Sequence, residues 1–569
     1  MRIPSIYLLV LTIGLAACRG DGPTPPPLPP GVIALAVGES RTLTAAQGAT
    51  IEVSGGSGGG EFVIIPFHGS QTASSNVALE FTPTQITGVT GPPTPQVGPA
   101  AEPLLSRASS IAGMNAAARF DASLRRLERE VFGPKLAAIR AARSARLSPS
   151  YSVSGSAGVP AVGDQMTLNV TRSACNNADL RTGRVVAVTP RTVIVADNAN
   201  PSGGFTDEEY IAIANQFDAS VYPLITQNFG VPQDIDANVG RSVIFYTRAV
   251  NELTAAGSES VIGGFFHPRD LFPKVGPDPN STNDDCAGSN EAEMFYMLVP
   301  DPLGEVNGNV RTKASVQRST VGVLAHEFQH LINASRRIYV NDASSFEEVW
   351  LNEGLSHIAE ELMFYQAAGL GPRQNISLST LQSSQQILDA VNAYQVSNLG
   401  RLVEYIEDPE VRSPYANDDE LATRGATWQL LRYAADRSST AQQTLWFNLA
   451  NARNAGIANF TAVFGGDFIP LVRDWATAQY TDDAVSTAPA LQHPSWHYRS
   501  ILPRLVDPQR FPLKTRTLTA GTPVSLTVRA GSAAYLRFGV GAGATGRITA
   551  TSSGGTLPSA VSLTLVRTR

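Results

Sequence analysis

The sequence has few charged residues and no excess of positive charge. Of its 569 residues 16% are charged, and the formal net charge is −6, which gives no electrostatic reason to expect nucleic acid as a partner. No apolar run reaches the roughly 20 residues that a membrane-spanning helix needs, which excludes a channel or transporter. Hydrophobic residues make up 43% of the chain, enough for packed cores, and 49 glycines with 38 prolines favour β-rich, turn-dense modules.

Cysteine is also scarce, and the first of the three cysteines has a distinctive context. Arg2 and an apolar stretch over residues 6–15 precede Leu15-Ala16-Ala17-Cys18, the pattern of a signal peptide. The junction resembles the lipobox of bacterial lipoproteins, which implies a signal peptide over residues 1–17 and a lipid on Cys18. The proline-rich residues 18–33 predict an extended tether. We therefore expect an exported protein of the bacterial cell envelope, anchored to a membrane through Cys18. Because Arg19 rather than Asp follows, the outer membrane or cell surface is favoured over the inner membrane.

The two remaining cysteines are Cys175 and Cys286. In an oxidising compartment a single pair is a natural disulfide candidate that would close a loop of about a hundred residues. The alternative is two separate buried thiols.

Composition divides the chain into several segments. Short strands bounded by Gly and Ser clusters predict a small β-sandwich-like module at each end of the chain. An Ala- and Arg-rich stretch with helical spacing predicts either a helical linker packed on a domain or a propeptide-like segment. The central unit begins with strands, continues as mixed α/β and ends largely helical, which makes the fold class α+β. The expected boundaries are 34–95 and 510–569 for the β modules, 96–150 for the helical segment, and 151–205, 206–310 and 311–500 for the three parts of the central unit.

The central unit contains the motif His326-Glu327-Phe328-Gln329-His330 within a predicted helix. Residues four apart lie on one face of a helix, so both imidazoles can reach the same metal ion. Glu327 flanks that face, where a metal-bound water would lie. The alternative, two histidines that merely solvate a helix face, does not account for the apolar flanks of the motif.

This motif supplies two ligands and a base, so a third ligand is required. Asn333 and Arg336 stand where metzincins have Gly and His or Asp, which excludes that class. Trp350-Leu351-Asn352-Glu353-Gly354 instead resembles the second zinc-site motif of gluzincin peptidases, in which the Glu after Asn is the ligand. The resemblance assigns that role to Glu353. Two neighbouring acids are rivals without the motif context, Glu347 and Glu348.

A wider resemblance is to the hyicolysin-type metallopeptidases, within the gluzincin clan. Residues 324–333 and 350–356 carry it most specifically, and it extends loosely over about residues 200–480, including 234–238, 263–266 and 289–294. The resemblance implies a thermolysin-like unit over residues 151–500, with a mixed sheet, the motif helix and a helical lobe. In such a unit an edge strand, here expected at residues 294–299, holds an extended peptide by main-chain hydrogen bonds.

The resemblance also implies a mechanism and a cofactor. His326, His330 and Glu353 would hold one zinc ion (Zn2+) per chain, and Glu327 would act as general base in the hydrolysis of a polypeptide substrate. Gluzincins usually add a Tyr or His that stabilises the oxyanion. Here the candidates for that donor or for a group behind the zinc ligands are His357, Tyr415 and Arg424.

Two other functions remain open at this point. The protein could be a non-enzymatic surface lipoprotein whose β modules bind glycan or protein and whose zinc site is structural. The presence of Glu327 argues against this, because a structural site has no use for that acid. It could also be an aminopeptidase, but the segment of the Gly-x-Met-Glu-Asn type that grips a substrate amine in that branch is missing. A zinc endopeptidase is therefore the leading prediction.

Overall fold

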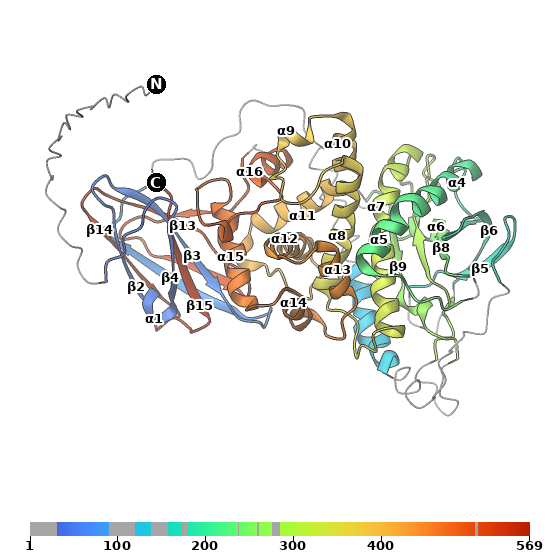
Figure 1. Ribbon diagram of the computed structural model, residues 1–569, viewed down its shortest axis with the longest axis horizontal. Coiled ribbons are helices and arrows are strands. Elements are labelled where there is room, and N and C mark those ends of the chain that lie inside the picture. Colours follow the sequence, from blue (N-terminus) through green and yellow to red (C-terminus); the bar gives the residue numbers. More distant parts are fainter. Residues whose placement is uncertain are drawn as a thin grey trace, which may run out of the picture.

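The computed structural model describes residues 31–89, 120–137, 158–172, 175, 179–236, 238–258, 261–275, 285–506 and 510–569. The expected signal peptide, Cys18 and most of the proline-rich tether lie outside these residues. Figure 1 shows an elongated molecule with a β-sandwich at one end, helices in the middle and a mixed sheet at the other end. Helices and sheets share the central unit, which agrees with the predicted α+β class. Among the described residues, no helix has the length and apolar character needed to cross a membrane.

The β-sandwich is built from both ends of the chain, where the sequence predicted two separate modules. Each sheet contains strands from both ends, and their buried side chains form one core. Strand β3 pairs with β13 and β15, and β4 lies between β12 and β14. Neither end alone supplies neighbours for its central strands, which explains why the two halves combine. The sheets, in spatial order, are β1 (Ser40–Thr44), β15 (Val561–Arg567), β3 (Gly60–His68), β13 (Leu536–Val540) and β11 (Arg516–Thr517), then β12 (Val524–Arg529), β4 (Asn76–Thr84), β14 (Thr545–Thr551) and β2 (Thr50–Ser54), with α1 (Ala45–Gly48) after β1.

The mixed sheet has six strands, and its last strand forms the edge next to the helical part. Strands β7, β8 and β10 are parallel, and β9 pairs with β10 in the antiparallel sense. The expected edge strand at 294–299 was wrong, because β10 lies between β8 and β9. Gly264 permits the extra strand, since a Cβ there would lie 2.7 Å from the carbonyl oxygen of Tyr296. The spatial order is β5 (Gln165–Asn169), β6 (Leu180–Val188), β7 (Thr192–Asp197), β8 (Ser242–Tyr246), β10 (Met294–Met297) and β9 (Gly264–Phe266).

Helices connect and cover this sheet and then form the middle of the molecule. The longest, α7, begins after Thr312, whose side chain accepts a hydrogen bond from the Ser315 amide, and α8 ends at Gly369 in the left-handed conformation. The helices are α4 (Asp207–Gln216), η2 (Phe217–Val221), α5 (Tyr222–Phe229), α6 (Arg248–Asn251), η3 (Pro268–Leu271), α7 (Lys313–Tyr339), α8 (Val349–Ala368), α9 (Leu378–Leu381), α10 (Gln385–Ala390), η4 (Val391–Gln395), α11 (Val396–Ile406), η5 (Pro409–Val411), α12 (Leu421–Arg437), α13 (Gln442–Ala450), α14 (Gly456–Phe464), α15 (Phe468–Thr481), η6 (Pro489–Leu491), α16 (Tyr498–Ile501) and η7 (Leu502–Leu505).

The helical segment 120–137, which includes η1 (Glu128–Phe132), packs between the mixed sheet and the helical part (cyan in Figure 1). Phe120 packs edge-on against Phe265 of β9 with ring centroids 5.2 Å apart, and Phe132 lies 5.3 Å from Phe272. The segment thus packs against the core, and it also reaches the site described below.

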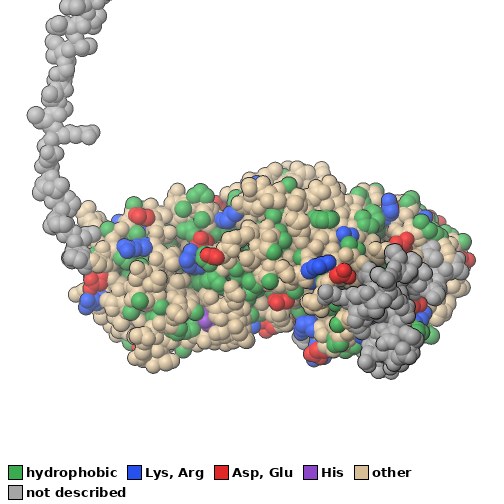
Figure 2. All heavy atoms as spheres, turned by 60° about the horizontal axis from the view of Figure 1, so that its bottom comes forward, with side chains coloured by type: hydrophobic (Ala, Val, Ile, Leu, Met, Phe, Trp, Pro, Cys, Tyr) green, Lys and Arg blue, Asp and Glu red, His purple; other side chains and the backbone are tan. Residues whose placement is uncertain are grey.

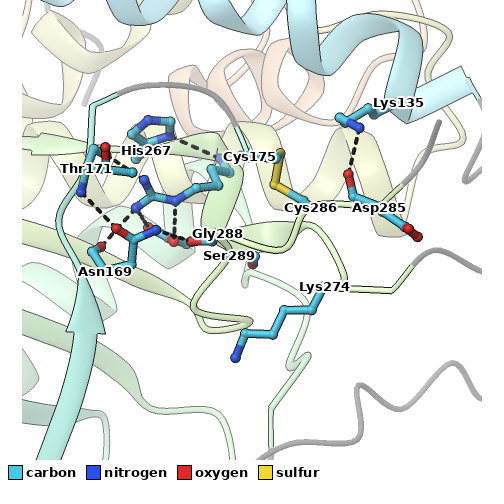
Figure 3. The surroundings of a disulfide bond; sticks show 12 residues. Lys135, Asn169, Thr171, Cys175, His267, Lys274, Asp285, Cys286, Gly288 and Ser289 are labelled. Carbon is cyan, nitrogen blue, oxygen red and sulfur yellow. Dashed lines mark hydrogen bonds and ion pairs between the residues drawn. A yellow bond between two sulfur atoms is a disulfide. The ribbon is translucent and has the colours of Figure 1, made fainter. Parts of the chain in front are cut away.

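Cys175 and Cys286, the pair expected to form a disulfide bond, are bonded to each other across 111 residues of sequence (Figure 3). The bond joins the chain beyond β5 to the chain that leads into β10. The Gly288 amide donates a hydrogen bond to the Cys175 carbonyl, and the Lys135 ammonium donates one to the Asp285 carbonyl. The disulfide therefore ties the outer strand of the sheet, its inner strands and the segment 120–137 together.

The surface carries little concentrated charge on the face that Figure 2 shows. Lys and Arg side chains are scattered there, with Asp and Glu side chains among hydrophobic and uncharged ones.

Candidate metal centre and active site

Helices α7 and α8 bring the three predicted metal ligands together in the interior. The Nε2 atoms of His326 and His330 are 3.1 Å apart, and they lie 3.6 and 3.5 Å from the two carboxylate oxygens of Glu353. Ligands at about 2.0–2.1 Å from a tetrahedral zinc ion are about 3.3–3.4 Å from one another. The two imidazoles and the carboxylate therefore form a triangle of ligand groups, and the separations between their atoms are close to the edge length of a zinc coordination tetrahedron.

The donor set also suits a metal ion at this place. Glu353 is 1% exposed, and neither of its carboxylate oxygens makes a hydrogen bond among the described residues. Burial opposes the charged form, but Arg424, His330 and His326 together hold the pKa of Glu353 well below its usual range. A buried ionised carboxylate needs positive charge nearby; Arg424, 3.2 Å from Glu353 Oε2, supplies part of it, and a metal ion would supply more. Two imidazoles and one carboxylate fit zinc.

Both histidines are held with Nε2 toward this triangle. The Nδ1 atom of His326 lies 2.8 Å from Glu360 Oε1, and the Nδ1 atom of His330 lies 3.1 Å from Asn352 Oδ1. Because carboxylate and amide oxygens only accept, each Nδ1 is the donor, which leaves the lone pair on Nε2 for a metal ion. Sequence reasoning missed Glu360. Its signal was the spacing, since it follows Glu353 by seven residues, two helical turns along the same face of α8.

Glu327 lies beside the ligand triangle and contacts the edge strand. It is buried, and its Oε2 accepts a hydrogen bond of 2.8 Å from the amide of Phe266 in β9. Burial raises the pKa of Glu327 to about 7. A carboxyl group that titrates near neutral pH is suited to take up and release a proton during a reaction.

The structure separates the three further candidates. His357 packs beside His326 with ring centroids 5.0 Å apart, and its Nδ1 lies 3.4 Å from Glu360 Oε1. His326, His357 and Glu360 form a second group of possible ligands, which shares His326 with the first. Burial lowers the pKa of His357 to about 3, so the ring is neutral.

Arg424 lies at the site and Tyr415 does not. The Arg424 guanidinium approaches Glu353 Oε2 to 3.2 Å and donates a hydrogen bond to Asp419 Oδ1. Tyr415 instead donates its hydroxyl hydrogen bond to the Ser70 carbonyl in the sandwich. The hydroxyl of Tyr415, a candidate oxyanion donor, is therefore hydrogen-bonded to the sandwich and does not face the metal ligands.

Two site residues come from the segment 120–137 and were not foreseen. Arg125 Nε lies 3.7 Å from Glu353 Oε1, and its guanidinium pairs with Glu128. Asp121 Oδ2 lies 3.2 Å from the guanidinium of Arg424. No local pattern could reveal the contacts to Glu353 and Arg424, because they join residues more than two hundred positions apart.

A cavity of about 630 Å³ opens next to the metal ligands. Its wall includes His326, Glu327 and Arg424. The chain at Gly263 and Gly264, which enters the edge strand β9, also lines it. The remaining lining is mostly small or apolar, with a few polar groups: Asp121, Val261, Ile262, Gly263, Gly264, Leu298, Val310, Arg311, Thr312, Ser315, Val316, Ser319, Gly322, Val323, Glu360, Ala393, Tyr394, Ser397, Arg401 and Leu421. A pocket with a few convergent polar groups is the usual form of a small-molecule or catalytic site.

Comparison with known proteins gives one informative similarity. The chain is 32% identical over 174 residues to the neutral metalloprotease ShpI of Staphylococcus hyicus. The match covers 31% of this chain and 34% of ShpI, so this chain spans about a third of that protein's length. No protein-family model matches the chain.

Proposed function

We propose that this protein is a zinc-dependent endopeptidase with a gluzincin-type site. The observation that carries the proposal is the triangle of His326, His330 and Glu353, sized for zinc, with the buried carboxyl of Glu327 beside it. The similarity to ShpI, a metalloprotease, supports a peptidase. Because the match covers only a third of each chain, the activity of the whole protein is our inference.

The mechanism follows from the chain's own groups. A zinc ion held by these residues would polarise a scissile carbonyl and lower the pKa of a water molecule, so that the water could lose a proton and attack the carbonyl at neutral pH. Glu327 takes the proton of that water and later gives it to the leaving amine. Glu360 and Asn352 keep the two histidines oriented. Arg424 is our candidate for the group that stabilises the oxyanion, because it lines the cavity and lies 3.2 Å from Glu353.

The edge strand suggests how a peptide is held. Strand β9 forms the edge of the mixed sheet, and Gly263 and Gly264 line the cavity next to Glu327. An extended peptide that adds to such an edge is held by main-chain hydrogen bonds along several of its residues. This favours internal cleavage of polypeptides over removal of single N-terminal residues.

Location and access are part of the same proposal. The signal and lipobox sequence supports an exported, membrane-anchored enzyme that acts outside the cytoplasm, and a disulfide bond is typical of oxidising compartments. The contacts of Asp121 and Arg125 support a propeptide-like role for the segment 120–137, which would restrict the cleft until it is displaced. If the segment restricts the cleft, a variant with both Arg125→Ala and Phe120→Ala cleaves peptides faster than the unmutated chain. If the segment is only structural, the same variant loses both stability and activity.

The test compares residues 19–569 with and without Glu327→Gln, using Glu208→Gln as a matched control. Glu208 is exposed at the start of α4, so this control makes the same change away from the site. We expect one zinc per chain in all three proteins, casein cleavage by the unmutated chain and the control, and no cleavage by Glu327→Gln. Zinc with equal cleavage in all three would refute the role of Glu327. Zinc without cleavage in any of them would leave a latent enzyme restricted by the segment 120–137 or the non-enzymatic lipoprotein. Cleavage gained by the variant with Arg125→Ala and Phe120→Ala would identify the latent enzyme, and continued inactivity would favour the lipoprotein.

A further inference from the structure

A third group of possible metal ligands lies at the amino ends of two parallel strands of the mixed sheet. Oxygens of Asp234, Asp236 and Glu293 all lie within 4.8 Å of one another. Asp234 and Asp236 belong to the chain between α5 and β8, and Glu293 directly precedes β10. Strands β8 and β10 are parallel neighbours, and Val243 donates a main-chain hydrogen bond to the Glu293 carbonyl. Their amino ends therefore bring the three carboxylates to one edge of the sheet.

Glu293 is the residue that points to a ligand. It is 2% exposed, and its Oε1 accepts a hydrogen bond of 2.5 Å from the Ile235 amide. Its Oε2 is buried without a hydrogen bond among the described residues. Burial raises the pKa of Glu293 well above its usual range, and the charges of Asp236 and Asp234 raise it further. The nearby charges thus add to the cost of ionising Glu293 and do not offset it.

The loop is shaped to present oxygens. Asp236 accepts hydrogen bonds of 2.8 Å from the amide and from the side chain of Asn238, whose own carbonyl accepts one from Arg241. Asp234, Asp236 and Asn238 alternate along the chain as the first oxygen ligands of calcium loops do. In such loops a Glu further along the chain adds a ligand, and here the fold brings Glu293 next to Asp234 and Asp236.

The size and chemistry of the cluster distinguish it from the zinc site. Oxygens bound to one Ca2+ at about 2.3–2.6 Å lie up to about 5 Å apart across the ion. A limit of 4.8 Å between the three carboxylates is compatible with that span. All-oxygen donor sets favour hard cations such as calcium, whereas the zinc triangle contains two nitrogens.

We propose that Asp234, Asp236 and Glu293 bind one calcium ion, which joins the chain before β8 to the start of β10. The ion compensates the buried Glu293 carboxylate and stabilises the inner strands of the mixed sheet. This site is structural and does not depend on the peptidase function proposed above.

Calcium binding is measured by titration calorimetry on zinc-loaded, calcium-depleted residues 19–569 that carry Glu327→Gln to prevent self-digestion. We expect one calcium site, an affinity at least about tenfold weaker after Glu293→Gln or Asp234→Asn, and an unchanged affinity after Glu291→Gln. Glu291 lies two residues before Glu293 and pairs with Lys274, so it controls for a general loss of negative charge. Asp234 is exposed, so its variant tests the site even if Glu293→Gln does not fold.

Thermal unfolding gives an independent result. Without calcium, Glu293→Gln melts no lower than the parent chain, because a neutral amide replaces a buried carboxyl group whose ionisation is unfavourable. With calcium, the parent chain melts higher than the variant. The absence of calcium binding, equal binding by the parent and both site variants, tighter binding of magnesium, or an equal loss in Glu291→Gln would each overturn the proposal.

Discussion

Glu360 and Glu361 are adjacent in α8. Replacing each of them with glutamine distinguishes an effect on zinc binding from an effect on the stability of the fold. Glu360 Oε1 holds the Nδ1 atom of His326 at 2.8 Å. Loss of such a supporting carboxylate weakens metal binding by about 10–100-fold, or about 1.4–2.7 kcal/mol. Glu360→Gln keeps a neutral acceptor and belongs at the lower end of this range, whereas Glu360→Ala belongs at the upper end.

Glu361 contacts another part of the helical core and serves as the matched control. Its Oε2 accepts two hydrogen bonds from Arg432, and its Oε1 accepts one from Trp496. Removal of one partner of a buried ion pair costs about 3–5 kcal/mol of stability. Glu361→Gln should therefore unfold at a lower temperature but bind zinc normally while folded.

Competition with a fluorescent zinc chelator measures the affinity, and circular dichroism measures the melting temperature. If Glu360→Ala bound zinc as tightly as the unmutated chain, Glu360 would not orient a ligand. If Glu361→Gln lost zinc at temperatures where it is folded, the separation of the two roles would be wrong.

Three further predictions concern stability. Burial and Arg437 hold the pKa of His493 well below 6.5, so below about pH 6.5 only the unfolded chain binds a proton at this ring. The free energy of unfolding therefore keeps the whole contribution of His493 above that pH and falls below it, by up to about 1.4 kcal/mol per pH unit. His493→Phe, which keeps the aromatic packing, should reduce that slope between pH 6.5 and 5 in urea unfolding, and an unchanged slope would refute the assignment. Replacement of Cys175 and Cys286 by serine should lower the free energy of unfolding by about 2–4 kcal/mol, since the bond closes a loop of 111 residues; a change below 1 kcal/mol, roughly, would show that the loop is restrained in other ways. Gly425→Ala should cost about 1–3 kcal/mol and lower cleavage, because its Cβ would lie 2.3 Å from the backbone of α11; unchanged melting and cleavage would mean that α11 and α12 separate freely.

The metal ligands were accessible to sequence reasoning because their signals are local. His326 and His330 are one helical turn apart, and Glu353 belongs to a short motif on the next helix. The structure brings all three within 4.8 Å. The likeness to metallopeptidases, stated from the same motifs, is supported by the similarity to ShpI.

Contacts between distant segments could not be predicted in the same way. The pairing of β3 with β13 and β15 depends on which end of the chain supplies each neighbour, and alternation along a strand does not reveal its partner. The place of β9 at the sheet edge and the approach of Arg125 to Glu353 are equally non-local. Tyr415 was proposed as an oxyanion donor from its position along the chain, which does not predict the direction in which its hydroxyl points.

The most direct test of the central claim is anomalous X-ray scattering at the zinc edge from crystals of the zinc-loaded chain. We expect one peak at about 2.0–2.2 Å from His326 Nε2, His330 Nε2 and an oxygen of Glu353. A zinc-loaded crystal with no peak between these three residues, or with its peak at His357 and Glu360, would contradict it.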